Sequence, residues 1–166
     1  MNLEMRDSSM YASIFMSSYS CSFISSPSSC HFNKPSQVRC LRLVGCHNIS
    51  VEGLSEVAAK LPLLEDLEIS NGPVSKEPLE AVGRCSPLLK SLKFNSHGYR
   101  RPRIECDEEA IAIAENMSEL RHLQLFGNKL TNDGLKAILD GCHHLESLDL
   151  RQCFNVTLTG NLERCA

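Results

Sequence analysis

A short spacing pattern of apolar residues recurs five times and constrains the fold more than any other feature of the sequence. The pattern has the form L-x-x-L-x-L, and its copies begin at Val38, Leu64, Leu89, Leu120 and Leu145. Successive copies start 26, 25, 31 and 25 residues apart. The L-x-L alternation places two apolar side chains on one face of a short strand and the intervening residue on the other. A chain of 166 residues with five in-phase copies is therefore expected to form one stacked domain.

The second half of each copy has the spacing of a helix. Apolar residues at i, i+3, i+4 and i+7 are Leu54, Val57, Ala58 and Leu61, and again Leu135, Ile138, Leu139 and Cys142. Helix N-caps are expected at Ser50, Ser75, Asp107 and Thr131. Strand followed by helix in every copy predicts an α/β fold, a leucine-rich-repeat solenoid. We expect a short right-handed horseshoe of about five repeats, with parallel strands on the concave face and helices on the convex face.

The chain must turn away from each strand at one equivalent position. The residues at that position are Cys46, Gly72, His97, Asn128 and Cys153. Cysteine and asparagine are suited to it because they are easily buried or can bond to freed backbone groups. The third repeat carries about six extra residues within 96–103, by comparison with the usual repeat length. We expect this insertion to form a rim loop that is a candidate contact site.

Residues 1–37 have a different composition from the repeat region, residues 38–166. They contain twelve serines and no acidic residue after Asp7. Their apolar residues follow no clear helical or alternating period, so we expect a disordered or loosely docked leader. A targeting segment and a cover for the open end of the repeats are the alternatives.

Charge and cysteine usage exclude several classes of function. The net charge of −3 and the isoelectric point near 6.1 disfavour a nucleic-acid partner. No apolar stretch reaches the roughly 20 residues of a membrane helix, so no membrane partner is expected. Nine cysteines, an odd number with no CxxC pair, predict free thiols and a cytoplasmic or nuclear protein, or one found in both. Cys142-His143-His144 and Cys46-His47 lack zinc spacing. We therefore expect no metal, no cofactor and no catalytic residue.

The outward positions of the predicted strands are the expected contact surface. The central row is Arg42, Glu68, Lys93, Gln124 and Asp149, and the flanking row is Arg39, Glu65, Lys90, Arg121 and Glu146. Opposite charges on neighbouring strands can pair with each other, so these rows either support the sheet or bind a partner.

Eight residues are the candidates for partner contact. They are Lys93, Arg100, Arg101, Arg103, His122, Gln124, Phe126 and Arg151. Phe126 is either an aromatic anchor or packed locally on a rim loop. The arginines of 100–103 either meet an acidic or phosphorylated partner or are neutralised by Glu105, Asp107, Glu108 and Glu109.

The repeats resemble the cysteine-containing leucine-rich-repeat class that is typical of F-box proteins. Gly-Leu opens the helices at Gly53 and Gly134, and cysteine ends them at Cys85 and Cys142. The runs LRHLQLFGN (120–128), LTNDGL (130–135) and LDLRQCFN (148–155) are similar to those of plant F-box/leucine-rich-repeat proteins. The resemblance covers about Val38 to Cys165.

This resemblance implies a substrate receptor of an SCF-type ubiquitin ligase, in which an F-box grips a Skp-type adaptor and the repeats bind a client protein on the concave face. Catalysis would take place on other subunits. Residues 1–37 lack an amphipathic three-helix pattern, and the sequence has no tryptophan. We therefore expect this chain, a fragment or a divergent form that stops within the fifth repeat, to bind the adaptor only if an F-box is supplied upstream. The alternative is a free-standing repeat scaffold without ligase coupling.

Overall fold

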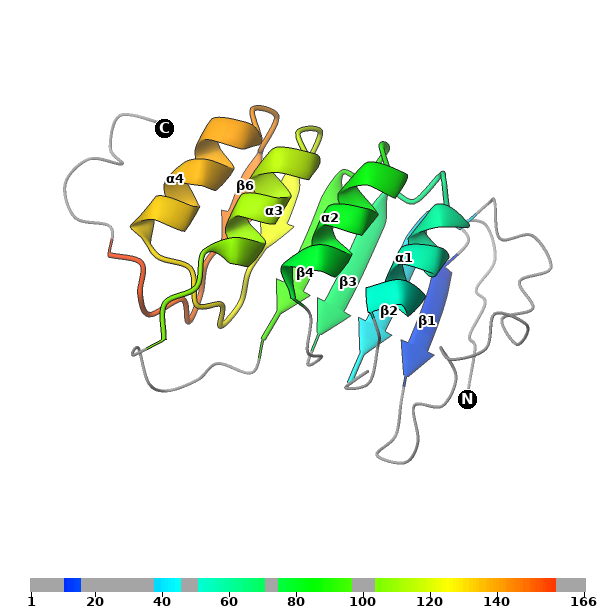
Figure 1. Cartoon of the computed structure of the whole chain (residues 1–166), viewed down its shortest axis with the longest axis horizontal. Coiled ribbons are helices and arrows are strands. Elements are labelled where there is room, and N and C mark those ends of the chain that lie inside the picture. The colour runs from blue at the N-terminus through cyan, green and yellow to red at the C-terminus, as the bar shows by residue number, and fades with distance from the viewer. Residues whose placement is uncertain (1–10, 16–37, 46–50, 71–74, 97–103, 158–166) are drawn as a thin grey trace.

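The computed structural model describes residues 11–15, 38–45, 51–70, 75–96 and 104–157. Strands and helices alternate along nearly all of this length (Figure 1). In chain order the elements are β1 (Tyr11–Phe15), β2 (Cys40–Val44), α1 (Val51–Ala59), β3 (Asp66–Ser70), α2 (Lys76–Cys85), β4 (Ser91–Asn95), α3 (Glu108–Asn116), β5 (His122–Gln124), α4 (Asn132–Gly141) and β6 (Ser147–Asp149).

The strands form one parallel sheet in the order β1 to β6. Its register aligns the predicted repeats, since Leu41 lies opposite Leu67 and the series continues through Leu92, Leu123 and Leu148. Neighbouring parallel strands need a crossover connection, and α1 to α4 provide one in each repeat from β2 onward. The four helices lie side by side on one face of the sheet (Figure 1). This arrangement confirms the predicted leucine-rich-repeat solenoid.

The core lies between the sheet and the helix layer. Strand leucines such as Leu67 and Leu92 and helix residues such as Leu79 and Ile113 are at most 2% exposed. Burying a side chain of this size stabilises the folded state by about 1.5–3 kcal/mol relative to leaving it exposed. The buried apolar residues of the described segments belong to one continuous cluster, so each repeat is expected to depend on its neighbours for stability.

Polar contacts at the helix starts tie one repeat to the next. Thr131 caps α4, where its Oγ1 accepts a hydrogen bond from the Asp133 backbone N–H at 3.1 Å. Asp107 holds the N-cap position of α3, but its carboxylate accepts from the Thr131 backbone N–H at 2.7 Å and from the Thr131 hydroxyl at 2.8 Å. A Cβ on Gly134 would clash with the Asp107 carboxylate unless that side chain shifted, so glycine allows this close contact. Ser75 also lies at an N-cap without capping through its side chain, and Ser50 lies outside the described residues.

Two of the predicted turn residues, Asn128 and Cys153, lie within the described segments, and both make hydrogen bonds in their turns. Asn128 is buried, and its Oδ1 accepts hydrogen bonds from the backbone N–H groups of Lys129 and Leu130 at 2.6 and 3.3 Å. Cys153 is also buried and donates through Sγ to the Leu125 carbonyl at 2.7 Å. The expected turn residues Cys46, Gly72 and His97 lie outside the described residues.

Strand β1 belongs to the serine-rich leader and lies at the edge of the sheet. Residues Tyr11–Phe15 pair in parallel with β2, from Tyr11 opposite Cys40 to Phe15 opposite Val44. These five residues lack an L-x-x-L-x-L frame, and their pairing with β2 corresponds to the docked alternative for the leader rather than to the disordered one. The edge of β2 presents unpaired backbone groups, and any extended segment can satisfy them without a repeat motif. The rest of residues 1–37 lies outside the described part of the chain.

The fifth repeat is less buried than the other repeats. Its frame residues Leu145, Leu148 and Leu150 are only partly buried, because no described element lies beyond β6. The insertion at residues 97–103 and the C-terminal residues 158–166 lie outside the described residues. No helix in the described segments is long and apolar enough to cross a membrane.

Candidate binding surface

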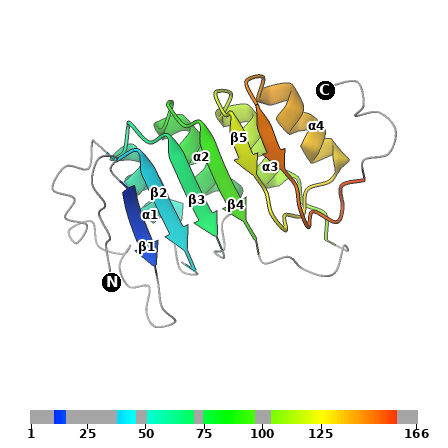
Figure 2. The same ribbon diagram turned by 180° about the vertical axis from the view of Figure 1, so that it is seen from behind.

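The sheet face opposite α1–α4 is covered by none of the described helices (Figure 2). We call it the open face. Alternation along each strand places the apolar frame residues against the helices and the residues between them on this face, as the burial pattern of β4 shows. The predicted outward rows therefore lie on one continuous surface, and their contacts decide which positions are available to a partner.

One side of the open face carries an ion-pair ladder, formed by Arg39, Arg42, Glu65, Glu68 and Lys90. Arg42 Nε lies 2.8 Å from Glu68 Oε2. Glu65 pairs with Arg39 on one neighbouring strand edge and with Lys90 Nζ, at 3.1 Å, on the other. The hydrogen bond from Lys90, followed in importance by that from Arg39, lowers the pKa of the Glu65 carboxyl. The predicted self-pairing is confirmed here, and exposed pairs of this kind contribute about 0–1 kcal/mol each.

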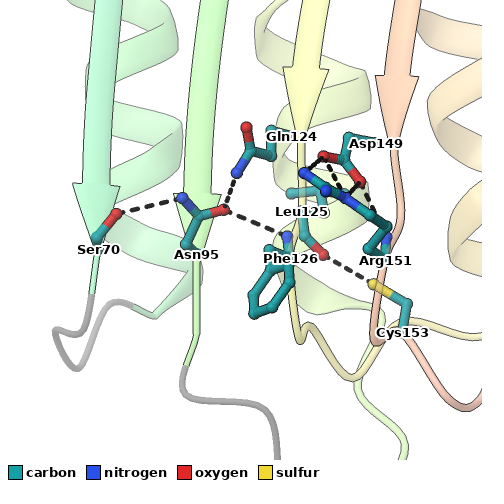
Figure 3. A network of polar contacts seen from close by, with 8 residues as sticks. All are labelled: Ser70, Asn95, Gln124, Leu125, Phe126, Asp149, Arg151 and Cys153. Atoms are coloured by element: carbon teal, nitrogen blue, oxygen red, sulfur yellow. Dashed lines mark hydrogen bonds and ion pairs between the residues drawn. The ribbon is translucent and has the colours of Figure 1, made fainter.

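A row of amide side chains links the ends of three strands (Figure 3). Asn95 donates through Nδ2 to Ser70 Oγ at 3.2 Å, and its Oδ1 accepts from Gln124 Nε2 at 3.0 Å. The same oxygen accepts from the Phe126 backbone N–H at 3.3 Å. Asn95 therefore joins β3, β4 and β5 at their carboxyl ends.

Phe126 lies in the turn after β5 rather than on the strand. Its backbone carbonyl accepts from the Ser96 N–H at 2.9 Å, and its side chain is only partly exposed. These contacts involve the backbone of Phe126, so both local packing of the ring and the aromatic-anchor interpretation stay open. A partner contact at Phe126 stays a prediction.

Arg151 is already engaged by a carboxylate. Its Nε lies 2.9 and 3.0 Å from the two Asp149 carboxylate oxygens, and its Nη2 lies 2.7 Å from Oδ2 (Figure 3). The hydrogen bonds from the Arg151 side chain lower the pKa of Asp149. Partner contact at Arg151 also stays a prediction, and it would have to compete with this forked pair.

A shallow groove of about 190 Å³ lies on the open face over the last three strands. It brings together three of the predicted contact residues, Lys93, His122 and Gln124, with Ser147 beside them. His122 Nδ1 lies 2.9 Å from Ser147 Oγ. The full lining is Ser91, Leu92, Lys93, His122, Leu123, Gln124, Ser147, Leu148 and Asp149.

Lys93 is the charged residue of the central row whose side chain has no ion-pair partner among the described residues. Neither an ion pair nor a hydrogen bond joins its side chain to any described residue, whereas Arg42 and Glu68 pair with each other. The neighbour of Lys93 on β5 is Gln124, which is neutral and donates to Asn95. The predicted alternation of charges therefore stops at Lys93, on the edge of the groove.

Three predicted contact residues cannot be placed on the open face, and two apolar residues of the connecting segments are exposed. Arg100, Arg101 and Arg103 lie outside the described residues. Ile104 and Phe154 are 63% and 55% exposed, and Asn155 Nδ2 donates to the Ile104 carbonyl at 3.2 Å. The repeat pattern gives no signal for either exposed residue, because both lie between the strand frame and the helix.

Nothing in the described segments resembles a metal centre, since no group of three or more His, Cys, Asp or Glu side chains converges there. The described cysteines Cys40, Cys85, Cys106, Cys142 and Cys153 are free. Burial raises the pKa of Cys142 to about 11 and also raises the pKa of Cys153. Both thiols are therefore protonated at neutral pH, which makes them poor nucleophiles.

Comparison with known proteins identifies relatives along most of the chain. A family model described as a leucine-rich repeat matches residues 117–139. F-box/LRR-repeat protein 23 of Arabidopsis thaliana is 52% identical over 137 residues, which cover 80% of this chain and 30% of that protein. F-box protein SKIP19 of the same plant is 50% identical over 132 residues, covering 80% of this chain and 42% of the relative. The chain thus spans less than half the length of either relative.

A solved structure is also similar to part of this chain. The tropomodulin C-terminal domain of Caenorhabditis elegans gives a TM-score of 0.44 at 17% identity, over 66% of this chain and 67% of that domain.

Proposed function

Since this chain is homologous to plant F-box/leucine-rich-repeat proteins over about four fifths of its length, we propose that it selects a client protein for an SCF-type ubiquitin ligase. This homology is the observation that supports the proposal most directly. In this role the repeats hold the client on the open face, and ubiquitin transfer takes place on other subunits. A Skp-type adaptor would connect the protein to the ligase through an F-box.

The open face supports the recognition part of this proposal. It is a sheet face with exposed polar side chains and a shallow groove, and a surface of this kind suits a protein segment. The ion-pair ladder leaves few free charges beside β2, so client contact is expected over β4–β6. Phe126, Arg151 and the arginines of residues 100–103 remain proposed contacts at the rim of this area.

The cellular compartment is part of the same proposal. We expect the protein in the cytoplasm, the nucleus or both, where a reducing environment keeps thiols free. The free cysteines of the described segments are consistent with this expectation. A fluorescent fusion to the full chain tests it, and accumulation in plastids, mitochondria or the secretory pathway would contradict it.

Client capture with a groove-blocking variant tests the recognition part. Ser147 is exposed on the open face, so Ser147→Trp places a bulky side chain in the groove without disturbing the core. Lys136→Trp makes a similar change on α4, on the helix face, and serves as the control. Clients captured from plant extract by the wild type and by Lys136→Trp should be lost with Ser147→Trp. Clients that persist on Ser147→Trp would show that recognition lies elsewhere.

Client turnover separates the ligase role from the alternative, a free-standing repeat scaffold without ligase coupling. If the protein is a ligase receptor, depleting it should raise the abundance of the captured client and lower its ubiquitin conjugates. Proteasome inhibition should remove the difference in abundance. An unchanged half-life and unchanged conjugates, with binding intact, would favour the scaffold.

A further inference from the structure

Lys93 occupies an unusual position on the open face. Five other basic side chains of the strand rows and their ends, those of Arg39, Arg42, Lys90, Arg121 and Arg151, lie within ion-pair distance of a carboxylate. Lys93 has no such partner among the described residues, and it lines the groove. Lys93 is only partly exposed and its ammonium has no counter-charge among the described residues, so a bound acidic group could pair with it.

The surrounding charges restrict where that acidic group can lie. Glu68 on the adjacent strand is neutralised by Arg42, and Asp149 at the far side of the groove is held by Arg151. Asp66 is exposed on β3 outside the groove lining, and it would repel an acid on its side of β4. The acidic group is therefore expected on the β5 side of Lys93, above His122 and Gln124.

The donors available there match a carboxylate better than a phosphate. A phosphate dianion is bound most strongly by forked guanidinium groups. Arg121 and Arg151, the arginines closest to the groove-lining residues in the sequence, already bind Glu146 and Asp149. One lysine with neutral donors from the hydroxyls of Ser91 and Ser147 suits a single negative charge.

We propose that the groove over β4–β6 binds an extended segment of the client that presents an aspartate or glutamate side chain to Lys93. This inference rests on the proposed function and makes it more specific. Lys93 acts as a specificity residue, because it favours acidic client segments over neutral or basic ones.

Selection from a random peptide library tests the proposal on the full chain. The library is displayed on phage and selected on the wild type, Lys93→Glu, Lys93→Gln and the control Lys136→Glu, which makes the same charge change on the helix face. Circular dichroism and a thermal melt establish that each variant is folded. Peptides from the wild-type selection are then measured against Ser147→Trp to identify those that need the groove.

Groove-dependent peptides should be enriched in aspartate or glutamate at one position. Their affinity should fall by about 10-fold or more with Lys93→Glu, less with Lys93→Gln, and not with Lys136→Glu. Peptides selected on Lys93→Glu should carry lysine or arginine at that position. Replacing the selected acid with asparagine should reproduce the loss on the wild-type protein.

Three results would overturn the proposal, and they are distinguishable. Groove-dependent peptides without an acidic preference would overturn the role of Lys93 and leave client recognition on the open face intact. Binding at least about 10-fold tighter with phosphoserine in place of the acid would replace the carboxylate by a phosphate. Peptides that are all insensitive to Ser147→Trp would contradict both this inference and the proposed open-face recognition.

Discussion

The fourth and fifth repeats have the same apolar spacing but differ in burial. Leu120, Leu123 and Leu125 are at most 2% exposed, whereas Leu145, Leu148 and Leu150 are only partly buried. The fourth repeat has β4 on one side and β6 on the other, while the fifth has a described neighbour on one side only. The apolar pattern thus determines which residues turn inward, and the neighbouring strand determines how fully they are buried.

The largest expected effect separates the central leucines of these two repeats. Leu123→Ala should lower the free energy of unfolding by about 2–5 kcal/mol, because it leaves a cavity between two strands. Leu148→Ala should cost less, about 1–2 kcal/mol, because part of its side chain is already exposed. Urea unfolding of both variants gives the comparison. Equal losses would show that the far side of β6 is covered in solution.

The turn residues should give the next largest effect. Asn128→Ala leaves two backbone N–H groups without their acceptor, which should cost about 1–3 kcal/mol. Cys153→Ala removes one weaker thiol donor from the Leu125 carbonyl and should cost about 1 kcal/mol or less. The same urea titration measures both variants. A cost at Cys153 that exceeds the cost at Asn128 would contradict the assigned roles.

Cys142 lies at the junction of the two repeats and should make stability depend on alkaline pH. Burial raises its pKa from 9.0 to about 11. Its contribution is therefore fully present below about pH 9 and is lost as the pH rises through about 11. The loss between about pH 9 and about pH 10.5 should be about 1–2 kcal/mol.

The matched variant for this prediction is Cys142→Ala, which removes the titrating group. Its unfolding free energy should fall less steeply than that of the wild type over the same pH range. Parallel curves for the two proteins would show that the Cys142 thiol does not carry the dependence.

The smallest expected effect concerns the left-handed residue in each turn. Gly127 has φ of 68°, and Gln152 holds the equivalent place with φ of 62°. A side chain in this conformation costs about 1–2 kcal/mol, which glycine avoids at some cost in chain entropy. Gln152→Gly should therefore stabilise the protein by about 0.5–1 kcal/mol, and Gly127→Ala should destabilise it. Thermal melts measure both, and a lower melting temperature for Gln152→Gly would contradict the prediction.

The sequence predicts the repeat register fully within the described strands. The frames from Val38 to Leu145 align residue by residue in the sheet, because a period-two pattern cannot slip by one residue without exposing its leucines. The N-cap positions at Ser75, Asp107 and Thr131 were also predictable. Their bonding was not, since Asp107 binds the next repeat rather than its own helix.

The candidate site was only partly predictable. Lys93, His122 and Gln124 could be placed on one surface from the register alone. That Arg42 and Arg151 are paired while Lys93 is not depends on side-chain rotamers, which spacing does not encode. The exposure of Ile104 and Phe154 depends on the path of the connecting segments, for which the sequence offers no periodic signal.

Strand β1 also affects how this protein meets other chains. A parallel sheet in strand order has two lateral edges, and each can template pairing with a second molecule. With Tyr11–Phe15 alongside β2, the first strand that carries a repeat frame lies inside the sheet, and β1 forms the lateral edge of the described sheet on that side. A second molecule that paired with this edge would therefore meet the backbone of β1 rather than that of a repeat strand.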